Sequence, residues 1–303
     1  MSQSLSRIVQ LSDIHVWEPS GLHPFDLIGK RGAGFANYRL RRRGEYSIAV
    51  LRAAIAKAVE TKPDVVLVSG DLSNLGLRSE LEQARRELQP VVDAKLRLAI
   101  IPGNHDAYLK SSLAGQFEEV LRDGQKADDR EASPYPFLMR LPTADLLCLT
   151  SAIATAPLMA YGRVGASQFA RAEAIMSRRD RSRPLALTVH HPVTPTPGKR
   201  NEYHRELRDA AALRSFAARH GAVLLAHGHN HLSHVVRLAG GCVVSGISSS
   251  TTRRDDHDHR RGEIVQYHLG ADGLVRLERS RWNEAAGAFS DWAAVDLSSL
   301  QAG

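Results

Sequence analysis

Short runs of apolar residues, many of them β-branched, recur along the chain and end abruptly in polar residues. Their length and composition are typical of buried strands. Such strands are predicted at residues 7–11, 64–69, 96–101, 145–150, 184–189 and 222–226. Between several of them, apolar residues recur every three or four positions, which indicates one apolar face of a helix. These helices are predicted at residues 45–60, 78–92 and 205–221.

Beyond residue 226 the pattern changes to consecutive short strands. They are predicted within residues 233–238, 242–247, 263–269 and 274–282, and the sequence Gly-Ala-Asp-Gly at 270–273 predicts a hairpin between the last two. The alternation of strands and helices before this point is typical of an α/β fold. No repeat or low-complexity linker interrupts the sequence. Residues 1–303 are therefore expected to form one domain, with an antiparallel, strand-rich C-terminal part from about residue 232.

The composition is that of a soluble globular protein, with 43% hydrophobic and 24% charged residues. The apolar runs are too short for a transmembrane helix, and the first residues lack the apolar core of a signal peptide. Cys148 and Cys242 lie within apolar runs and are expected to be buried thiols, which fits a reducing cytoplasm. The net charge of +7 favours anionic partners, namely phosphate compounds, nucleic acid or acidic lipid. A cytoplasmic protein is expected.

Five of the predicted strands end in side chains that bind metals. In chain order the donors are Asp13 and His15; Asp71; Asn104, His105 and Asp106; His190 and His191; and His227, His229 and His231. In open α/β sheets, ligands bind at the carboxyl ends of the strands. Each motif alone has an ordinary explanation as a turn, a helix cap or a core histidine. Five strand ends with such donors in order predict a metal cluster, and the mixture of carboxylate, amide and imidazole suits Mn, Fe, Zn or Co.

This order of motifs resembles that of the calcineurin-like metallophosphoesterases. The blocks of that family are D-x-H, G-D, G-N-H-D/E, H and G-H-x-H. They stand here as Asp13-Ile14-His15, Gly70-Asp71, Gly103-Asn104-His105-Asp106, His190 and Gly228-His229-Asn230-His231. The resemblance spans residues 13 to 231. It implies a central β-sandwich flanked by helices, with two divalent metal ions at the strand ends.

The resemblance also implies a role for each donor. Asp13, His15 and His231 would hold the first metal, and Asn104, His190 and His229 the second. Asp71 would bridge both, because its two oxygens can span two cations. In this family the single histidine stands two residues before a proline, so His190 is assigned as the ligand and His191 is the alternative. Mn²⁺ is the first choice of metal, with Fe, Zn or Co as alternatives.

His105 and Asp106 are the candidate catalytic residues that are not ligands. By resemblance, His105 would sit over the phosphoryl group and either stabilise developing charge or protonate the leaving oxygen. Asp106 is expected to orient His105 through its ring N–H. His227 lies outside the family pattern and is interpreted as structural. The acidic and histidine residues at 255–259 are interpreted as a solvated loop.

The blocks around Asp71 and Asn104 lack the arginines of the Ser/Thr protein phosphatases of this superfamily. They resemble the bacterial phosphodiesterase-type branch, which includes class III cyclic nucleotide phosphodiesterases. The first functional hypothesis is therefore hydrolysis of a phosphodiester by a hydroxide that bridges the two metals. The alternatives are a UDP-2,3-diacylglucosamine-type pyrophosphate hydrolase of lipid A synthesis, a nuclease, and a non-enzymatic metal-binding scaffold. The complete set of ligands and His105 argues against the scaffold.

An insertion is predicted at about residues 20–47, where residues 21–47 combine basic and apolar side chains. Arg39, Arg41, Arg42 and Arg43 are the candidate contacts to an anionic substrate. A solvated helix face would explain the same sequence. Basic charge beside apolar residues also suits a membrane surface, and arginines with aromatic residues suit nucleic acid. A peripheral association with the membrane is thus one expectation for this cytoplasmic protein.

Overall fold

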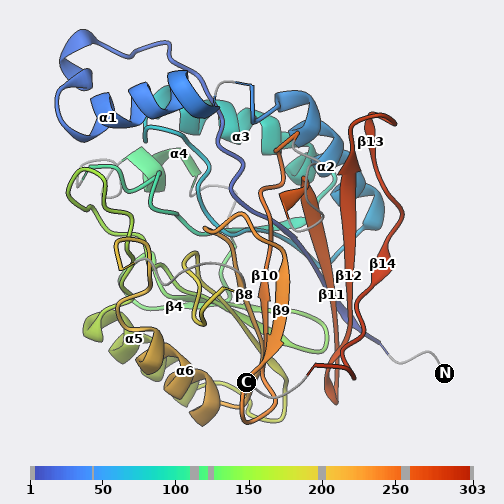
Figure 1. The fold of residues 1–303 in the computed structure, drawn as a ribbon. Helices are drawn as coiled ribbons and strands as arrows, with labels where there is room; N and C mark the ends of the chain where they lie inside the picture. The colour runs from blue at the N-terminus through green and yellow to red at the C-terminus, as the bar shows by residue number, and fades with distance from the viewer. Residues whose placement is uncertain are drawn as a thin grey trace.

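The computed structural model describes residues 4–42, 44–109, 116–121, 126–196, 203–253 and 260–300. In this part of the chain, two seven-stranded sheets pack face to face, and helices cover the outer face of each sheet (Figure 1). This arrangement of layers, α/β/β/α, confirms the fold class expected from the sequence. Among the described residues, no helix has the length and hydropathy needed to cross a membrane.

The first sheet joins strands from both ends of the chain. In spatial order its strands are β13 (Ala288–Phe289), β12 (Gly273–Asn283), β11 (Glu263–Gly270), β1 (Ser6–Leu11), β2 (Val65–Val68) and β3 (Arg97–Ile100), with β14 (Ala293–Ala294) beside β12. Strands β1, β2 and β3 are parallel, and β11 adds antiparallel to β1. Gly270 pairs with Gly273 at the end of the β11–β12 ladder, where the sequence predicts the hairpin.

The second sheet carries the middle of the chain. Its strands, in spatial order, are β4 (Asp129–Arg130), β5 (Phe137–Arg140), β6 (Asp145–Cys148), β7 (Leu185–Thr188), β8 (Ala222–His227), β10 (Val243–Gly246) and β9 (His234–Arg237). The expectation of a wholly antiparallel C-terminal part is wrong for β10, which runs parallel to β8. All four residues of β10 are buried, whereas those of β9 are half-exposed, so β10 takes the inner place and β9 the edge.

Helices cover the sheets in pairs. The helices, in chain order, are η1 (Pro24–Leu27), α1 (Lys30–Asn37), η2 (Tyr38–Arg42), α2 (Ile48–Thr61), α3 (Arg78–Asp93), α4 (Glu118–Leu121), α5 (Ala166–Ser177) and α6 (Ala210–Arg219). Leu51 of α2 and Leu81 of α3 pack in one apolar cluster with Val66 of the first sheet. Phe216 of α6 packs with Leu187 of the second sheet in another cluster. Helix α1 lies apart from these pairs, beyond α3 and α4 in Figure 1.

The strands read as continuous apolar runs because both of their faces are covered. Along β2, Val65 and Leu67 face the core between the two sheets, while Val66 and Val68 face helices α2 and α3. Backbone hydrogen bonds then join the loops that leave the carboxyl ends of the strands, from Asp13 N to Gly70 O (2.9 Å) and from Gly228 N to His190 O (3.0 Å). The polar strand ends of both sheets are thereby gathered at one edge of the sandwich.

Candidate metal centre

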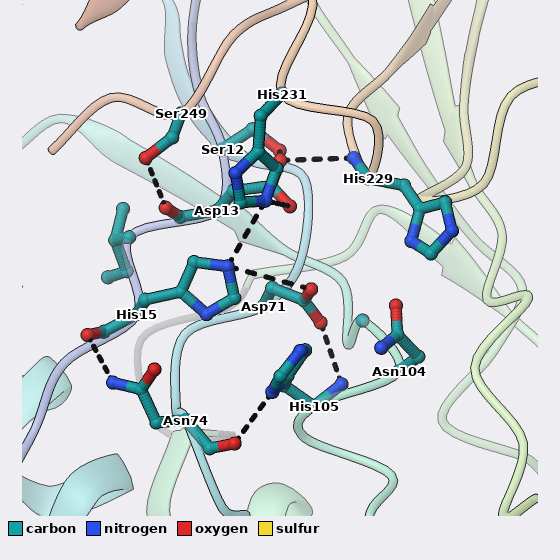
Figure 2. Close-up of polar contacts among 12 residues, drawn as sticks. Ser12, Asp13, His15, Asp71, Asn74, Asn104, His105, His229, His231 and Ser249 are labelled. Carbon is teal, nitrogen blue, oxygen red and sulfur yellow. Dashed lines mark hydrogen bonds and ion pairs between the residues drawn. The ribbon is translucent and has the colours of Figure 1, made fainter. Parts of the chain in front are cut away.

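Two groups of possible metal ligands meet at this edge and share one carboxylate. The first group is Asp13, His15, Asp71 and His231, and the second is Asp71, His190 and His229. Within each group the ligand atoms all lie within 4.8 Å of one another. Figure 2 shows the side chains of His15, His231 and Asp13 turned toward one another beside Asp71. The structure therefore brings together six of the residues that the sequence proposes as ligands.

Donor atoms of the first group converge without satisfying one another. His231 Nε2 lies 3.1 Å from Asp13 Oδ1 and 3.2 Å from His15 Nε2. Asp13 Oδ1 is buried and makes no hydrogen bond in the described structure, despite this close approach. A buried polar atom without a partner is costly, so lone pairs that point at a common centre fit a bound cation.

The second group includes Asn104 as well. His190 Nε2 lies 3.4 Å from Asp71 Oδ2 and 3.3 Å from Asn104 Oδ1. His190 Nδ1 lies 2.8 Å from the Ser69 carbonyl and donates to it, which leaves Nε2 as the nitrogen for a metal. His229 is buried, and neither of its ring nitrogens has a hydrogen-bond partner in the described structure. These residues fit a second cation.

His191, the alternative to His190, points elsewhere. Its Nδ1 lies 2.7 Å from Ser151 Oγ, and its Nε2 lies 3.0 Å from the Ala160 carbonyl. Both ring nitrogens are thus occupied by protein groups. His227 is likewise outside both groups, with Nδ1 3.1 Å from the Gly228 carbonyl and its ring against His234.

The backbone at the ligands is strained. Five residues of the two groups have φ between 44° and 71°: Asp13, His15, Asp71, His229 and His231. They make up most of the eight non-glycine residues with positive φ in the described part of the chain. This conformation costs roughly 1–2 kcal/mol per non-glycine residue. Strain of this kind persists where the surroundings over-determine it, and its concentration here marks a functional site.

Buried hydroxyl and amide groups hold the strained loops in place. Ser249 Oγ donates to the Asp13 carbonyl at 2.7 Å, and Thr251 Oγ1 donates to the Ile14 carbonyl at 3.0 Å. Asn74 Nδ2 donates to the His15 carbonyl at 2.6 Å (Figure 2). Sequence reasoning missed these residues. For Ser249 and Thr251, the available signal was the polar run at residues 248–252 directly after the apolar strand predicted at 242–247.

The charge states of Asp71 and His229 suit metal binding. Burial opposes ionisation of Asp71, but the imidazoles of His190, His105 and His15 hold its pKa well below the ordinary value. Burial and the neighbouring His191 hold the pKa of His229 well below its ordinary value, so this ring is neutral. Burial lowers the pKa of His190, but Asp71 outweighs it and raises the pKa to about 9. Metal binding must therefore displace a proton from His190.

His105 lies at the edge of the centre and belongs to neither ligand group. Its backbone N–H donates to Asp71 Oδ1 at 2.8 Å, and its ring stands edge-on to His15 with centroids 4.8 Å apart. Ring nitrogen Nδ1 lies 2.6 Å from the Asn74 carbonyl (Figure 2). His105 is half-buried, so it has access to a molecule at the centre.

The expectation that Asp106 orients the His105 ring is wrong. The carboxylate of Asp106 accepts hydrogen bonds from the backbone amides of Leu72 (3.1 Å), Ser73 (2.9 Å) and Gly103 (2.9 Å). Asp106 is fully buried, and backbone amides of two loops surround it. The ring N–H of His105 donates to the Asn74 carbonyl instead. Asp106 thus fixes the loops that carry Asp71 and Asn104.

A sequence profile of the calcineurin-like phosphoesterase family matches residues 6–233. The chain belongs to this family. With the two ligand groups, membership indicates a metal-dependent phosphoric ester hydrolase with a dimetal site. No curated protein matches the sequence significantly.

Solved structures share the fold at low sequence identity. A purple acid phosphatase from yellow lupin (Lupinus luteus) seeds is 12% identical, with a TM-score of 0.62 over 97% of this chain and 54% of that chain. A dimetal phosphatase from Danio rerio is 14% identical, with a TM-score of 0.61 over 90% of this chain and 95% of that chain. The chain thus spans about half the length of the lupin enzyme, and these likenesses show the fold alone.

The chain has a further aromatic residue at the centre, Tyr46, which the sequence did not single out. Its hydroxyl lies 3.4 Å from His231 Nδ1, and its ring centroid lies 4.5 Å from that of His15. Tyr46 stands at the end of the insertion and forms an isolated β-bridge with Thr252. The insertion therefore reaches the first ligand group.

The insertion packs on the loop that follows Asp71. Arg31 donates to the carbonyls of Leu75 (3.1 Å) and Gly76 (3.0 Å). A Cβ at Gly34 would lie 2.0 Å from the Tyr108 hydroxyl, so glycine permits this close approach. Arg39, one of the four candidate arginines, is exposed and lies over the insertion's own Phe35 ring.

The other three candidate arginines lie partly or wholly outside the described residues. Residue 43 is not described, and only the backbone of residues 41 and 42 is described. The loop at 255–259 also lies outside the described residues.

Proposed function

We propose that this protein hydrolyses phosphodiesters with two divalent cations, Mn²⁺ being the first choice, at the shared carboxylate of Asp71. The observation that carries the proposal is the pair of ligand groups that meet at this one residue. Two bound cations supply the charge that activates water and stabilises the phosphoryl group during in-line displacement. Asp13, His15 and His231 would hold one cation, and Asn104, His190 and His229 would hold the other.

His105 serves the leaving group in this proposal. Nδ1 donates to the Asn74 carbonyl, and Nε2 is the ring nitrogen to which we assign the transfer of a proton to the leaving oxygen. The hydrogen bond from the His105 backbone to Asp71 keeps the ring beside the shared carboxylate. Asp106 acts as a positioning residue through the loops that it holds.

A lipid-linked pyrophosphate is the second candidate substrate. The observation that favours it is the exposure of three large apolar side chains of the insertion, Phe25 (84%), Ile28 (75%) and Leu40 (83%). A peripheral position at a membrane surface, on the cytoplasmic side, goes with this candidate.

Nucleic acid is the weaker alternative, because aromatic rings near the insertion are already engaged. Trp17 stacks on Tyr38 with centroids 3.9 Å apart and contacts Phe35 at 6.0 Å. Rings packed on one another offer less surface for stacking of bases.

The test is hydrolysis by protein stripped of metal and then reloaded. Exhaustive chelation is expected to abolish hydrolysis of bis-p-nitrophenyl phosphate, and Mn²⁺ is expected to restore it. Activity that survives verified metal removal would contradict the proposal. A panel with the p-nitrophenyl monoester, cyclic nucleotides, UDP-diacylglucosamine and single-stranded DNA then separates the diester, the lipid-linked pyrophosphate and the nuclease.

A further inference from the structure

We infer that Lys30 and Thr155 form an anion-binding site beside the metal centre, which takes a second anionic group carried by the leaving part of the substrate. The inference rests on the proposed function and deepens it. It assigns to the protein a class of substrate in which the leaving group itself bears a carboxylate or a phosphate.

The position of Lys30 is defined by contacts from two separate segments. Lys30 Nζ donates to Thr155 Oγ1 at 2.7 Å and lies 4.9 Å from the centroid of the Tyr108 ring. Tyr108 in turn lies 5.6 Å from the His105 ring. Lys30 is therefore on the His105 side of the centre, where the leaving group departs in the proposed reaction.

The segment that carries Lys30 is fixed from both sides. Arg31, the next residue, binds the backbone carbonyls of Leu75 and Gly76. Thr155 Oγ1 lies 2.5 Å from the Met159 carbonyl and donates to it, so it accepts from Lys30. The ammonium is thus held in one place by its neighbours, and only one of its three N–H groups donates to a described residue.

Among the described side chains, no carboxylate contacts the ammonium of Lys30. In the described part of the chain no salt bridge joins Lys30 to a carboxylate, and its ammonium contacts a hydroxyl and an aromatic face. Burial lowers the pKa of Lys30 to about 8, against the attraction of the Asp71 carboxylate. A half-buried ammonium without a paired carboxylate stabilises an anion that enters, because the cost of removing Lys30 from water is already met in the folded protein.

The proposed site binds two anionic groups of the substrate at two different places. The ligand groups around Asp71 receive the reacting phosphoryl group, and Lys30 receives a charge on the far side of His105. A diester with a neutral leaving group uses only the first. A pyrophosphate or a diester with a charged leaving group uses both, so the pair favours the second kind of substrate.

The test measures binding and needs no turnover. Mn²⁺-loaded protein is titrated calorimetrically with phenylphosphonate and with 4-carboxyphenylphosphonate, which differ by one carboxylate and are not hydrolysed. Wild type is expected to bind the carboxylated compound about tenfold more tightly, as one hydrogen bond to a charged group provides. Lys30→Met should lose this preference, whereas Lys30→Arg should retain part of it. Lys126→Met, which replaces an exposed lysine outside the insertion, is the matched control and should retain it fully.

The outcomes show whether Lys30 binds an anion or only connects the insertion to Thr155. Equal binding of both phosphonates to wild type, no binding of either, or an unchanged preference in Lys30→Met would overturn the inference. Elemental analysis of each variant shows whether the metals are retained. Failure of the proposed function is seen separately, as absence of metal-dependent diester hydrolysis by wild type.

Discussion

The ligand groups and the insertion differ in how firmly the fold holds their side chains. The ligands are almost all buried, five of them sit on strained backbone, and hydroxyl and amide groups tie down their loops. Helix α1 of the insertion has no buried residue and rests on the neighbouring loop through Arg31 and Gly34. The first region can change little without losing its geometry. The exposed side chains of the insertion can be replaced without loss of the fold, which suits this region to recognition of a substrate or of a membrane surface.

The largest effect is expected from Asp71→Asn, which strikes the residue shared by both ligand groups. The amide has no charge and only one oxygen to offer, so both cations should be lost. Hydrolysis should fall by about 10³-fold or more, since metal activation contributes several kcal/mol. Elemental analysis of the purified variant gives the metal stoichiometry.

Two controls make this prediction specific. Asp272→Asn makes the same chemical change on an exposed hairpin and should alter neither metal content nor activity. His231→Ala and Asn104→Ala each affect one group and should cost less than Asp71→Asn. Retention of two metals by Asp71→Asn would refute its shared role.

The sequence predicted the ligand region well for a physical reason. Each motif directly follows a strand that is buried on both faces, and parallel strands end at the same edge of a sheet. Once β1 and β2 are recognised, Asp13 and Asp71 must lie at one edge of the first sheet, and β7 and β8 place His190 and His229 at one edge of the second. That the two edges meet was implied by the family resemblance. The sheet to which each later strand belongs could not be predicted, because β9 and β10 join one sheet and β11 and β12 the other with similar local patterns.

The residues that the sequence assigned wrongly or did not single out make contacts that form only when the loops fold. In the sequence, Asp106 has several possible hydrogen-bond partners. Only the folded loops show that backbone amides surround its carboxylate. Tyr46 reaches His231 across 185 residues of chain. Among the basic residues of the insertion, charge alone could not distinguish Lys30, which contacts Thr155 and the Tyr108 ring, from Arg39, which is exposed.

His105→Ala tests the boundary between the two regions, since this residue lies beside Asp71 and also adjoins Tyr108. Turnover should fall by about 10²–10⁴-fold, the usual contribution of general acid–base catalysis, while both metals remain bound. The loss should be smaller for a p-nitrophenyl leaving group, which needs little protonation, than for an alkyl leaving group. An equal loss for both would assign His105 to charge stabilisation. Loss of metal would instead make it part of the ligand region.

The smallest effect on catalysis is expected at the outer face of the insertion. Replacement of Phe25, Ile28 and Leu40 by Ser changes side chains that are 75–84% exposed and that the fold does not need for packing. Hydrolysis of a small diester should therefore stay within about twofold of wild type. If this face inserts into a membrane interface, however, the variant should lose affinity for phosphatidylglycerol vesicles by about tenfold or more, because each apolar side chain that is buried contributes about 1.5–3 kcal/mol.

Arg39→Ser separates the electrostatic part of such binding from the apolar part. One basic residue near an anionic surface contributes about 1 kcal/mol, so its loss should weaken vesicle binding a few-fold at low salt and hardly at all at high salt. Sedimentation with phosphatidylglycerol vesicles at two salt concentrations measures the electrostatic and the apolar contributions to binding. Phosphatidylcholine vesicles show how much of the binding is independent of charge. If wild type binds neither vesicle at low salt, the apolar side chains of the insertion meet solvent or a protein instead. The lipid-linked pyrophosphate then loses its structural support, whereas the inference for Lys30, which contacts Thr155 and the Tyr108 ring, is unaffected by that result.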